Sequence, residues 1–284
     1  WVTARKVEER LQAELQTDVS LRVENTDSPD KWIVSGRGEL HLSILIETMR
    51  REGYELQVSR PEVIVKEIDG VECEPFERVR IDTPEEYQGS IIQALSERKG
   101  DLLEMEITGN GQARLVFLVP ARGLIGFTTE FMSMTRGYGI MNHTFDQYMP
   151  MVKGTIGGRS RGALISMDQG SVTSYAMVYV QERGVLFVEA GTEVYGGMII
   201  GEHSRDNDLT VNVTKAKQQT NVRSSNKDST SVLNASKILS LEESLEFLGD
   251  DEYMEVTPES IRLRKQILDK AMREKATKKK KTAE

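Results

Sequence analysis

The fold of the amino-terminal part is decided by the stretch Ser35-Gly36-Arg37-Gly38-Glu39-Leu40-His41-Leu42 and the residues that follow it as far as Gly53. Two glycines relax the backbone between the short apolar run at 32–34 and an amphipathic helix. Four apolar residues recur at helical spacing and form one face of this helix: Leu42, Leu45, Ile46 and Met49. Gly53 suits the end of a helix, and residues 54–58 then alternate like a half-buried strand. The pattern is strand, glycine turn, helix, strand.

This stretch is very similar to the GRGELHL segment of ribosomal translocation-type GTPases, the elongation factor G group. In elongation factor G a large decoding domain is inserted soon afterwards, whereas here Ser59-Arg60-Pro61-Glu62-Val63 leads straight into the next unit. Residues 119–126 (VPARGLIG) and 157–167 (GGRSRGALISM) closely resemble the BipA (TypA) family of translational GTPases. That resemblance covers essentially the whole chain. The LepA (elongation factor 4) branch also lacks the inserted domain, but it ends in a different module.

Two consecutive units of one kind are predicted, over residues 1–60 and 61–150. In the first, apolar spacing indicates the order helix, strand, strand, helix, strand. The second repeats this order behind an added front end, where Asp69-Gly70 predicts a tight hairpin. Both are predicted to be ferredoxin-like split βαβ sandwiches in an α+β fold, with helices on one face of an antiparallel sheet. The family resemblance implies that they correspond to domains III and V of elongation factor G.

The amino-terminal sandwich lacks an opening strand, and the chain begins with Trp1 inside a predicted helix. We therefore expect a carboxy-terminal fragment of a longer protein, in which the empty sheet position is exposed or filled by a neighbour. We also expect both sandwiches to remain folded when everything after about Met151 is deleted.

Residues 151–284 form a third, strand-rich and glycine-rich unit, which by resemblance is the family-specific carboxy-terminal domain. Alternating large side chains predict strands, among them one from Thr173 to Tyr179. Residues 207–230 contain almost no large apolar side chains and predict a long loop, which is usually functional or disordered. Two helices are predicted to follow. Ser240 and Glu243 make a capping box for the first, and Thr257-Pro258-Glu259 is expected to begin the second.

Composition limits the possible functions. An apolar fraction of 38% and a charged fraction of 29% suit two or three packed domains. The net charge of −8 argues by itself against a nucleic-acid-binding protein, although local charge decides what a surface attracts. The single cysteine, Cys73, allows no intrachain disulfide. No signal peptide opens the chain and no apolar run approaches membrane-spanning length, so a cytoplasmic protein is expected.

No catalytic, cofactor or metal site is predicted in this chain. A phosphate-binding loop needs Lys and then Ser or Thr after its second glycine, but Ala163 and Leu164 follow Gly162. The possible metal ligands are too scattered for a recognisable site: His41, His143, His203 and Cys73. We interpret His41 as a helix-start residue at a sheet edge. For the full-length protein, by contrast, the family resemblance implies GTP, Mg²⁺ and GTPase activity.

Basic side chains supply the candidate RNA-binding residues. The segment from Leu209 to Lys227 contains no acidic residue, and its four cations are candidates for phosphate contacts: Lys215, Lys217, Arg223 and Lys227. The alternative, a polar loop without a partner, is disfavoured by the length and by the absence of acids. Arg159 and Arg161 lie among glycines and could grip RNA phosphates, or could equally form a solvated turn or a domain contact. Arg122, Arg136 and the basic tail at 275–281 are weaker candidates.

The resemblance gives these features a functional hypothesis. It implies a non-catalytic arm of a BipA/TypA-type GTPase that binds the ribosome and ribosomal RNA and reaches the acceptor region of transfer RNA. It also implies an association with ribosome assembly and with growth under stress. Several weak patches on one arm would reinforce one another through effective concentration. Off the ribosome a monomer without membrane contacts is expected. The rival hypothesis is a small-ligand sensor, because paired ferredoxin-like domains commonly bind ligands between them, and the negative net charge mildly favours it.

Overall fold

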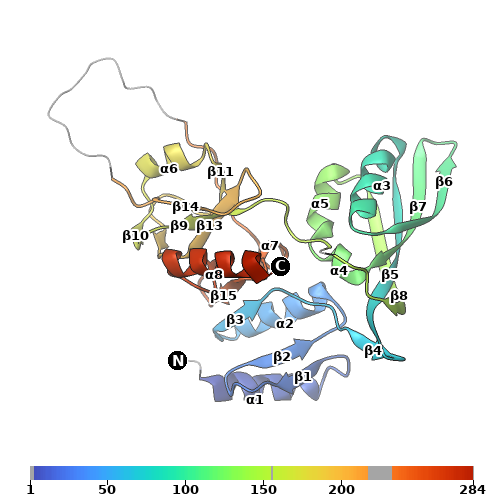
Figure 1. The fold of residues 1–284 in the computed structure, drawn as a ribbon, viewed down its shortest axis with the longest axis horizontal. Helices are drawn as coiled ribbons and strands as arrows, with labels where there is room; N and C mark the ends of the chain where they lie inside the picture. The colour runs from blue at the N-terminus through green and yellow to red at the C-terminus, as the bar shows by residue number, and fades with distance from the viewer. Residues whose placement is uncertain (1–2, 155, 217–231, 284) are drawn as a thin grey trace. The chain divides into compact units, whose positions relative to one another are not determined.

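The computed structural model describes residues 3–154, 156–216 and 232–283, and it confirms the predicted α+β fold class. The chain divides into two compact units (Figure 1). The first unit combines residues 1–59 with residues 160–244 and 248–284, whereas the second consists of residues 60–159 with residues 245–247. The carboxy-terminal part of the chain therefore shares a compact unit with the amino-terminal part.

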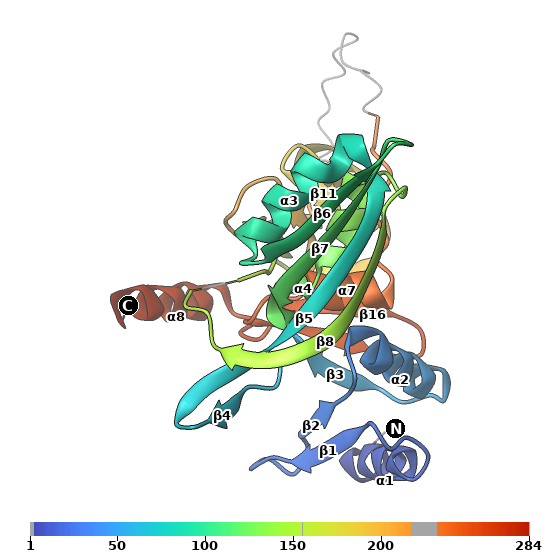
Figure 2. The ribbon, with the colours of Figure 1, turned by 90° about the vertical axis from the view of Figure 1, so that its right-hand side faces the viewer.

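The second unit is a ferredoxin-like sandwich with a complete antiparallel sheet. Its elements are β4 (Lys66–Ile68), β5 (Val71–Pro84), the 3₁₀ turn η1 (Glu85–Tyr87), α3 (Gln88–Glu97), β6 (Asp101–Thr108), β7 (Gln112–Pro120), α4 (Ala121–Leu124), α5 (Phe127–Met134) and β8 (Ile140–Pro150). The long strands lie in the order β8-β5-β7-β6 (Figure 2), and β4 pairs with the start of β5 through the hairpin predicted at Asp69-Gly70. Helices α3 and α5 pack on one face, because alternate strand residues such as Ile81 and Phe117 form a core with Leu95 and Phe127.

The amino-terminal part of the first unit follows the predicted order of elements. These are α1 (Ala4–Leu15), β1 (Arg22–Asn25), β2 (Trp32–Ser35), α2 (Glu39–Arg51) and β3 (Leu56–Ser59). β1 and β2 form a two-stranded antiparallel sheet. The buried core consists of Val7 and Leu11 from α1, Leu45 and Met49 from α2, and Leu21 from the loop before β1. Gly53 follows α2 with a φ of 96°, a conformation that glycine adopts without strain at a helix end.

Strand β3 does not join β1 and β2 in a sheet. It pairs in antiparallel fashion with β15 (Glu252–Val256), so that Leu56 lies opposite Val256 and Ser59 opposite Tyr253. Deletion after about Met151 was expected to leave the strands of residues 1–60 complete, and that reason is wrong, because their last strand is hydrogen-bonded to a strand some two hundred residues later along the chain. Whether residues 1–60 stay folded without it remains a prediction.

The carboxy-terminal part of the first unit is built on a sheet ordered β14-β9-β13-β16-β15-β3, with β11 also paired to β13. Its elements are β9 (Ala163–Ser166), β10 (Gly170–Ser171), α6 (Ser174–Val180), β11 (Gly184–Leu186), β12 (Glu193–Val194), β13 (Met198–His203), β14 (Leu209–Val211), α7 (Leu241–Phe247), β15, β16 (Ile261–Lys265) and α8 (Lys270–Ala283). β14 lies parallel to β9, and the other pairs are antiparallel. Leu164, Ile200 and Val213 of this sheet region pack with Met177 and Val180 of α6.

The strand predicted from Thr173 to Tyr179 is wrong, since residues 174–180 form the helix α6. The buried residues are Ala176, Met177 and Val180, which recur at helical rather than alternating positions. Thr173 caps the helix by accepting a hydrogen bond from the backbone N–H of Ala176 at 3.1 Å. A short apolar run fits either periodicity, and here the cap and the core decided in favour of a helix.

The predicted helix start at Thr257 is also wrong. Residues 257–260 form the turn between β15 and β16, in which the Thr257 hydroxyl accepts a hydrogen bond from the Ser260 N–H at 3.0 Å. The Thr and Ser side chains here close a turn instead of capping a helix. The capping box at Ser240 and Glu243 is confirmed, because each side chain bonds the other residue's backbone N–H, at 3.0 and 3.1 Å.

Candidate nucleic-acid interface

Lys215 is the one of the four candidate cations in the basic segment that falls within the described residues. It follows β14 and the buried Val213, and its side chain is exposed. The Thr173 hydroxyl donates to the Lys215 carbonyl at 2.6 Å, and the Thr173 N–H donates to the Val213 carbonyl at 3.0 Å. The backbone of Lys215 is thus held while its ammonium group faces water. Lys217, Arg223 and Lys227 lie outside the described residues.

Helix α6 also holds the residues that follow residue 231. The Gln181 side-chain amide donates to the Val232 carbonyl at 3.1 Å and accepts from the Asn234 N–H at 2.9 Å. The two ends of this helix therefore bind both described flanks of residues 217–231, Thr173 at one end and Gln181 at the other (Figure 1). Local sequence patterns do not indicate this arrangement, since it depends on hydrogen bonds between residues more than forty positions apart.

Arg161 lies on an exposed turn of the first unit. Its guanidinium is 4.0 Å from the Glu202 carboxylate, and its side chain is 56% exposed. The turn is fixed close by, because the Gly162 N–H donates to the Arg205 carbonyl at 2.7 Å and a Cβ on Gly162 would lie 2.1 Å from the Asn207 carbonyl oxygen. Arg161 is therefore placed where a phosphate could reach it.

Arg159 belongs to the second unit and has a different environment. Its guanidinium donates to the Phe247 carbonyl at 2.9 Å and lies 4.3 Å above the centre of the Phe247 ring. These contacts hold Arg159 in a packing role within the second unit. Its value as a phosphate ligand remains a prediction.

Arg122, a weaker candidate, makes structural contacts. Its guanidinium pairs with the Glu74 carboxylate at 2.5 Å and also donates to the carbonyls of Val152 and Gly154. Glu74 is completely buried, and one of its oxygens also accepts the Val152 N–H at 2.8 Å. Arg122 and Glu74 thus join α4 to β5, and both bond to residues that follow β8 within the second unit.

A buried lysine stabilises the turn beside the basic segment. Lys265 of β16 is 2% exposed, and its ammonium lies 2.6 Å from Asp208, 2.8 Å from Glu252 and 3.0 Å from Asp251. Burial alone would lower the pKa of Lys265, but the carboxylates of Glu252 and Asp208 outweigh burial and raise it. Asp208 also accepts the Ala163 N–H at 2.7 Å. This charged cluster therefore fixes the residues that lead into β14.

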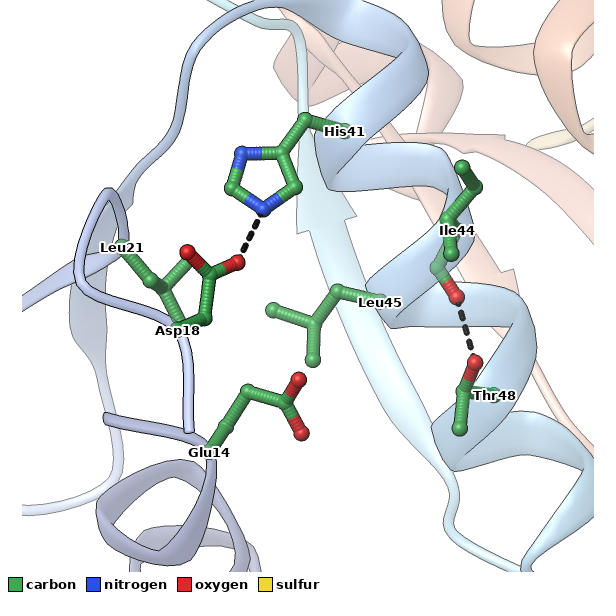
Figure 3. Close-up of a pocket in the computed structure, with 7 residues that line it drawn as sticks. All are labelled: Glu14, Asp18, Leu21, His41, Ile44, Leu45 and Thr48. Atoms are coloured by element: carbon green, nitrogen blue, oxygen red, sulfur yellow. Dashed lines mark hydrogen bonds and ion pairs between the residues drawn. The ribbon is translucent and has the colours of Figure 1, made fainter. Parts of the chain in front are cut away.

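The glycine-rich stretch that decides the amino-terminal fold places His41 beside a small pocket (Figure 3). The Arg37 N–H donates to His41 Nδ1 at 3.1 Å, which leaves Nε2 to donate to Asp18 at 2.5 Å. Asp18 also accepts the hydroxyl and backbone N–H of Ser20, and these bonds, together with His41, hold the pKa of the Asp18 carboxyl well below its usual range. His41 thus joins the start of α2 to the loop after α1.

The pocket itself offers little to a ligand. It measures about 100 Å³, and its polar groups include Asp18 and His41, which already bond to each other. Ligand pockets typically measure about 300–1,000 Å³. Among the residues that the structure describes, no group of three or more His, Cys, Asp or Glu side chains could hold a metal ion. This pocket is therefore part of the fold and not the functional site.

Sequence reasoning missed the aromatic surface of α6. Tyr175 and Tyr179 are one helical turn apart, and their rings lie 5.2 Å apart at an angle of 68°. The strand prediction grouped these two residues with Thr173 and Met177, whereas in the helix Met177 is buried and Tyr179 is 57% exposed. The sequence does contain a signal for the helix, because the apolar residues at 176, 177 and 180 recur at helical spacing.

Comparison with known proteins explains the order of the domains. Residues 2–60 match elongation factor G domain III, residues 71–156 match the elongation factor G C-terminus, and residues 161–270 match the TypA/BipA C-terminal domain. The chain is 68% identical over 283 residues to the large ribosomal subunit assembly factor BipA of Bacillus subtilis, which is 100% of this chain and 46% of that protein. Along its whole length the chain is similar to the BipA/TypA family.

More distant BipA proteins align over nearly the same span. The large ribosomal subunit assembly factors BipA of Escherichia coli K12 and Haemophilus influenzae are each 52% identical over 276 residues, or 97% of the chain. The chain spans slightly less than half the length of the relatives it matches. Lys215 and Arg161 fall inside the BipA C-terminal domain, whereas Arg159 precedes it. No described helix is long and apolar enough to cross a membrane.

Proposed function

We propose that this chain is the ribosome-binding part of a BipA-type translational GTPase that acts in assembly of the large ribosomal subunit. The observation that carries the proposal is the 68% identity, over the whole chain, to a Bacillus subtilis protein named as a large ribosomal subunit assembly factor. The part of the protein proposed to bind GTP and Mg²⁺ and to hydrolyse GTP lies outside this chain. We expect this chain to contribute no catalytic residue, to act in the cytoplasm and in growth under stress, and to be a monomer off the ribosome.

Contact with RNA is proposed for the first unit. Lys215 presents an exposed ammonium group on a backbone that Thr173 holds, and Arg161 presents an exposed guanidinium on a fixed turn. With Lys217, Arg223 and Lys227 they would neutralise phosphates of ribosomal RNA or of the transfer RNA acceptor region. Arg159 is a further candidate, which would reach a phosphate from its position in the second unit.

The test is a salt titration of ribosome binding. We expect the combined change of Lys215, Lys217, Arg223 and Lys227 to Ala to weaken co-sedimentation and to lower the salt-dependence slope by roughly 1 for each phosphate that is no longer neutralised. The matched control removes four exposed cations elsewhere, Lys6, Arg22, Lys31 and Lys153. An unchanged slope in the first variant, with an intact circular dichroism spectrum, would contradict the proposed binding of RNA.

A small-ligand sensor is not supported by a particular observation. The pocket beside His41 is several times smaller than typical ligand pockets. Calorimetry with ribosome-free protein would detect binding of a small ligand. In the same experiment we expect GTP to show no saturable binding at micromolar concentration.

A further inference from the structure

Helix α6 carries two aromatic rings in contact with each other, of which Tyr175 is half-buried and Tyr179 is exposed. Its inner side is buried through Ala176, Met177 and Val180, while Tyr179 keeps 57% of its surface exposed. The rings of Tyr175 and Tyr179 touch edge to face, at 5.2 Å between centres. The rings are therefore held by each other.

The position of this helix is also held from both ends. Thr173 caps it and donates to the Lys215 carbonyl, and Gln181 bonds to Val232 and Asn234 beyond the other end. A surface that is already ordered loses little conformational entropy when a planar ligand stacks on it. Such ordering favours a binding role over an incidental pair of surface tyrosines.

The charge around the rings indicates the class of ligand. The exposed Lys215 leaves the core at the amino-terminal end of α6, in a stretch from Leu209 to Lys227 that has no acidic residue. The pKa of the Tyr179 hydroxyl is raised by its neighbouring tyrosine and, at the other end of α6, by the exposed Glu182, which the exposed Arg183 follows in the chain. Proteins that hold single-stranded nucleic acid combine cations for the backbone with aromatic rings for the bases. A flat, uncharged peptide side chain would gain nothing from Lys215.

We propose that Tyr175 and Tyr179 form a stacking platform for an unpaired base of single-stranded RNA, with Lys215 holding the neighbouring phosphate. The platform rests on the RNA-binding role proposed above and adds the form of RNA that is bound. Since every base has an aromatic face, the site would accept any base and would reject a fully paired duplex.

The experiment compares three RNA probes of equal length by fluorescence anisotropy: a single strand, the same strand with abasic sites, and a blunt duplex. Wild-type protein should bind the single strand most tightly. Changing Tyr179→Ala should weaken single-strand binding roughly 5- to 150-fold, the usual contribution of one stacked base, and leave the salt slope unchanged. Tyr179→Phe keeps the ring and should bind like the wild type.

The abasic probe separates stacking from phosphate binding. Tyr179→Ala should bind the abasic strand as the wild type does, whereas Lys215→Ala should lower the salt slope by roughly 1 for both strands. Protein that sediments with ribosomes but binds the base-containing and abasic strands equally would overturn the platform and leave the RNA-binding role intact. An equal decrease in affinity with Tyr179→Phe and Tyr179→Ala would likewise overturn stacking, because Phe retains the aromatic face.

Discussion

The two sandwich regions of this chain follow the same order of elements but complete their sheets differently. Residues 60–159 pair all four long strands with one another, and the core between that sheet and its helices includes Val79 and Phe117, both fully buried. Residues 1–59 divide their strands, since β1 and β2 form a small sheet of their own while β3 pairs with β15. Similar local sequence patterns therefore produced one region that pairs its long strands internally and one whose last strand pairs with a distant strand.

The difference shows what a strand pattern leaves open. A strand presents backbone donors and acceptors on both edges, and any complementary edge can satisfy them. In the second unit β5 is paired on both sides, with β7 and β8. In the first unit the pairing of β3 is made by Tyr253 to Val256 of the carboxy-terminal part. The carboxy-terminal part thus supports both the candidate RNA surface and the amino-terminal fold.

Truncation after Pro150 should have the largest effect on the stability of residues 1–59. If it had no effect there, the difference drawn between the two regions would be wrong. We expect amides of residues 56–59 to lose most of their hydrogen-exchange protection, because β15 is removed, while amides of residues 76–84 remain protected. Both tryptophans of the chain lie in residues 1–59, so their fluorescence reports this region alone. The control is truncation after Asp269, which removes α8 and keeps β15 and β16. Equal protection of residues 56–59 in both truncations would show that β3 is stable without β15.

Each of the two compact units contains a fully buried carboxylate that pairs with a cation, and removing either cation should be the next largest effect. Lys265→Ala removes the cation beside the fully buried Glu252, and Arg122→Ala removes the cation beside the fully buried Glu74. Each change should cost about 3–5 kcal/mol of the unfolding free energy. Lys265→Ala should also reduce protection of β3, because β16 supports β15, whereas Arg122→Ala should act only on the second unit.

The matched control for these two variants is Arg5→Ala, which breaks an exposed pair with Glu9 and should change stability by less than about 0.5 kcal/mol. Urea unfolding followed by tryptophan fluorescence, with hydrogen exchange for the second unit, measures all three. The comparison of the two regions would be wrong if Lys265→Ala and Arg122→Ala destabilised residues 1–59 equally.

Acid should have the smallest effect, and it should act on residues 1–59. Hydrogen bonds from Arg50 and Arg51 lower the pKa of Glu47 to about 2 from its usual 4.5. Because the folded pKa is depressed, this carboxylate stabilises the fold above pH 4.5, and the contribution disappears as the pH falls towards 2. Glu47→Gln should remove about 0.3–0.5 kcal/mol at pH 7 and flatten the tryptophan-monitored stability profile in that window. If stability fell as steeply with decreasing pH in Glu47→Gln as in the wild type, a group other than Glu47 would cause the acid sensitivity.

Local patterns predicted most elements of both sandwiches. The helix from 39 to 51 was evident from its apolar face and from Gly53, and the capping box at Ser240 was evident from two residues three positions apart. These features depend on neighbours within one or two helical turns. The errors occurred where two local interpretations competed: residues 174–180 fitted both periodicities, and Thr257-Pro258 fitted both a helix start and a turn.

The candidate site was predicted only in part. Lys215 and Arg161 were identified from charge and glycine context, and the structure places both on exposed surface. Arg159 was grouped with Arg161 because they are two residues apart, yet its guanidinium packs on Phe247. The ring pair of Tyr175 and Tyr179 was missed, because recognising it required the correct secondary structure first.

By itself the sequence determined the order of helices and strands in the two sandwiches, the acid-free basic segment and the family motifs, because each is written in residues that are close together along the chain. Only the tertiary structure decided that β3 pairs with β15, that Lys265 is buried among three carboxylates, and that α6 holds both flanks of residues 217–231. The physical reason is that backbone hydrogen bonds and buried charges take whichever partner the fold brings near. That partner is selected by packing over the whole unit and not by local sequence.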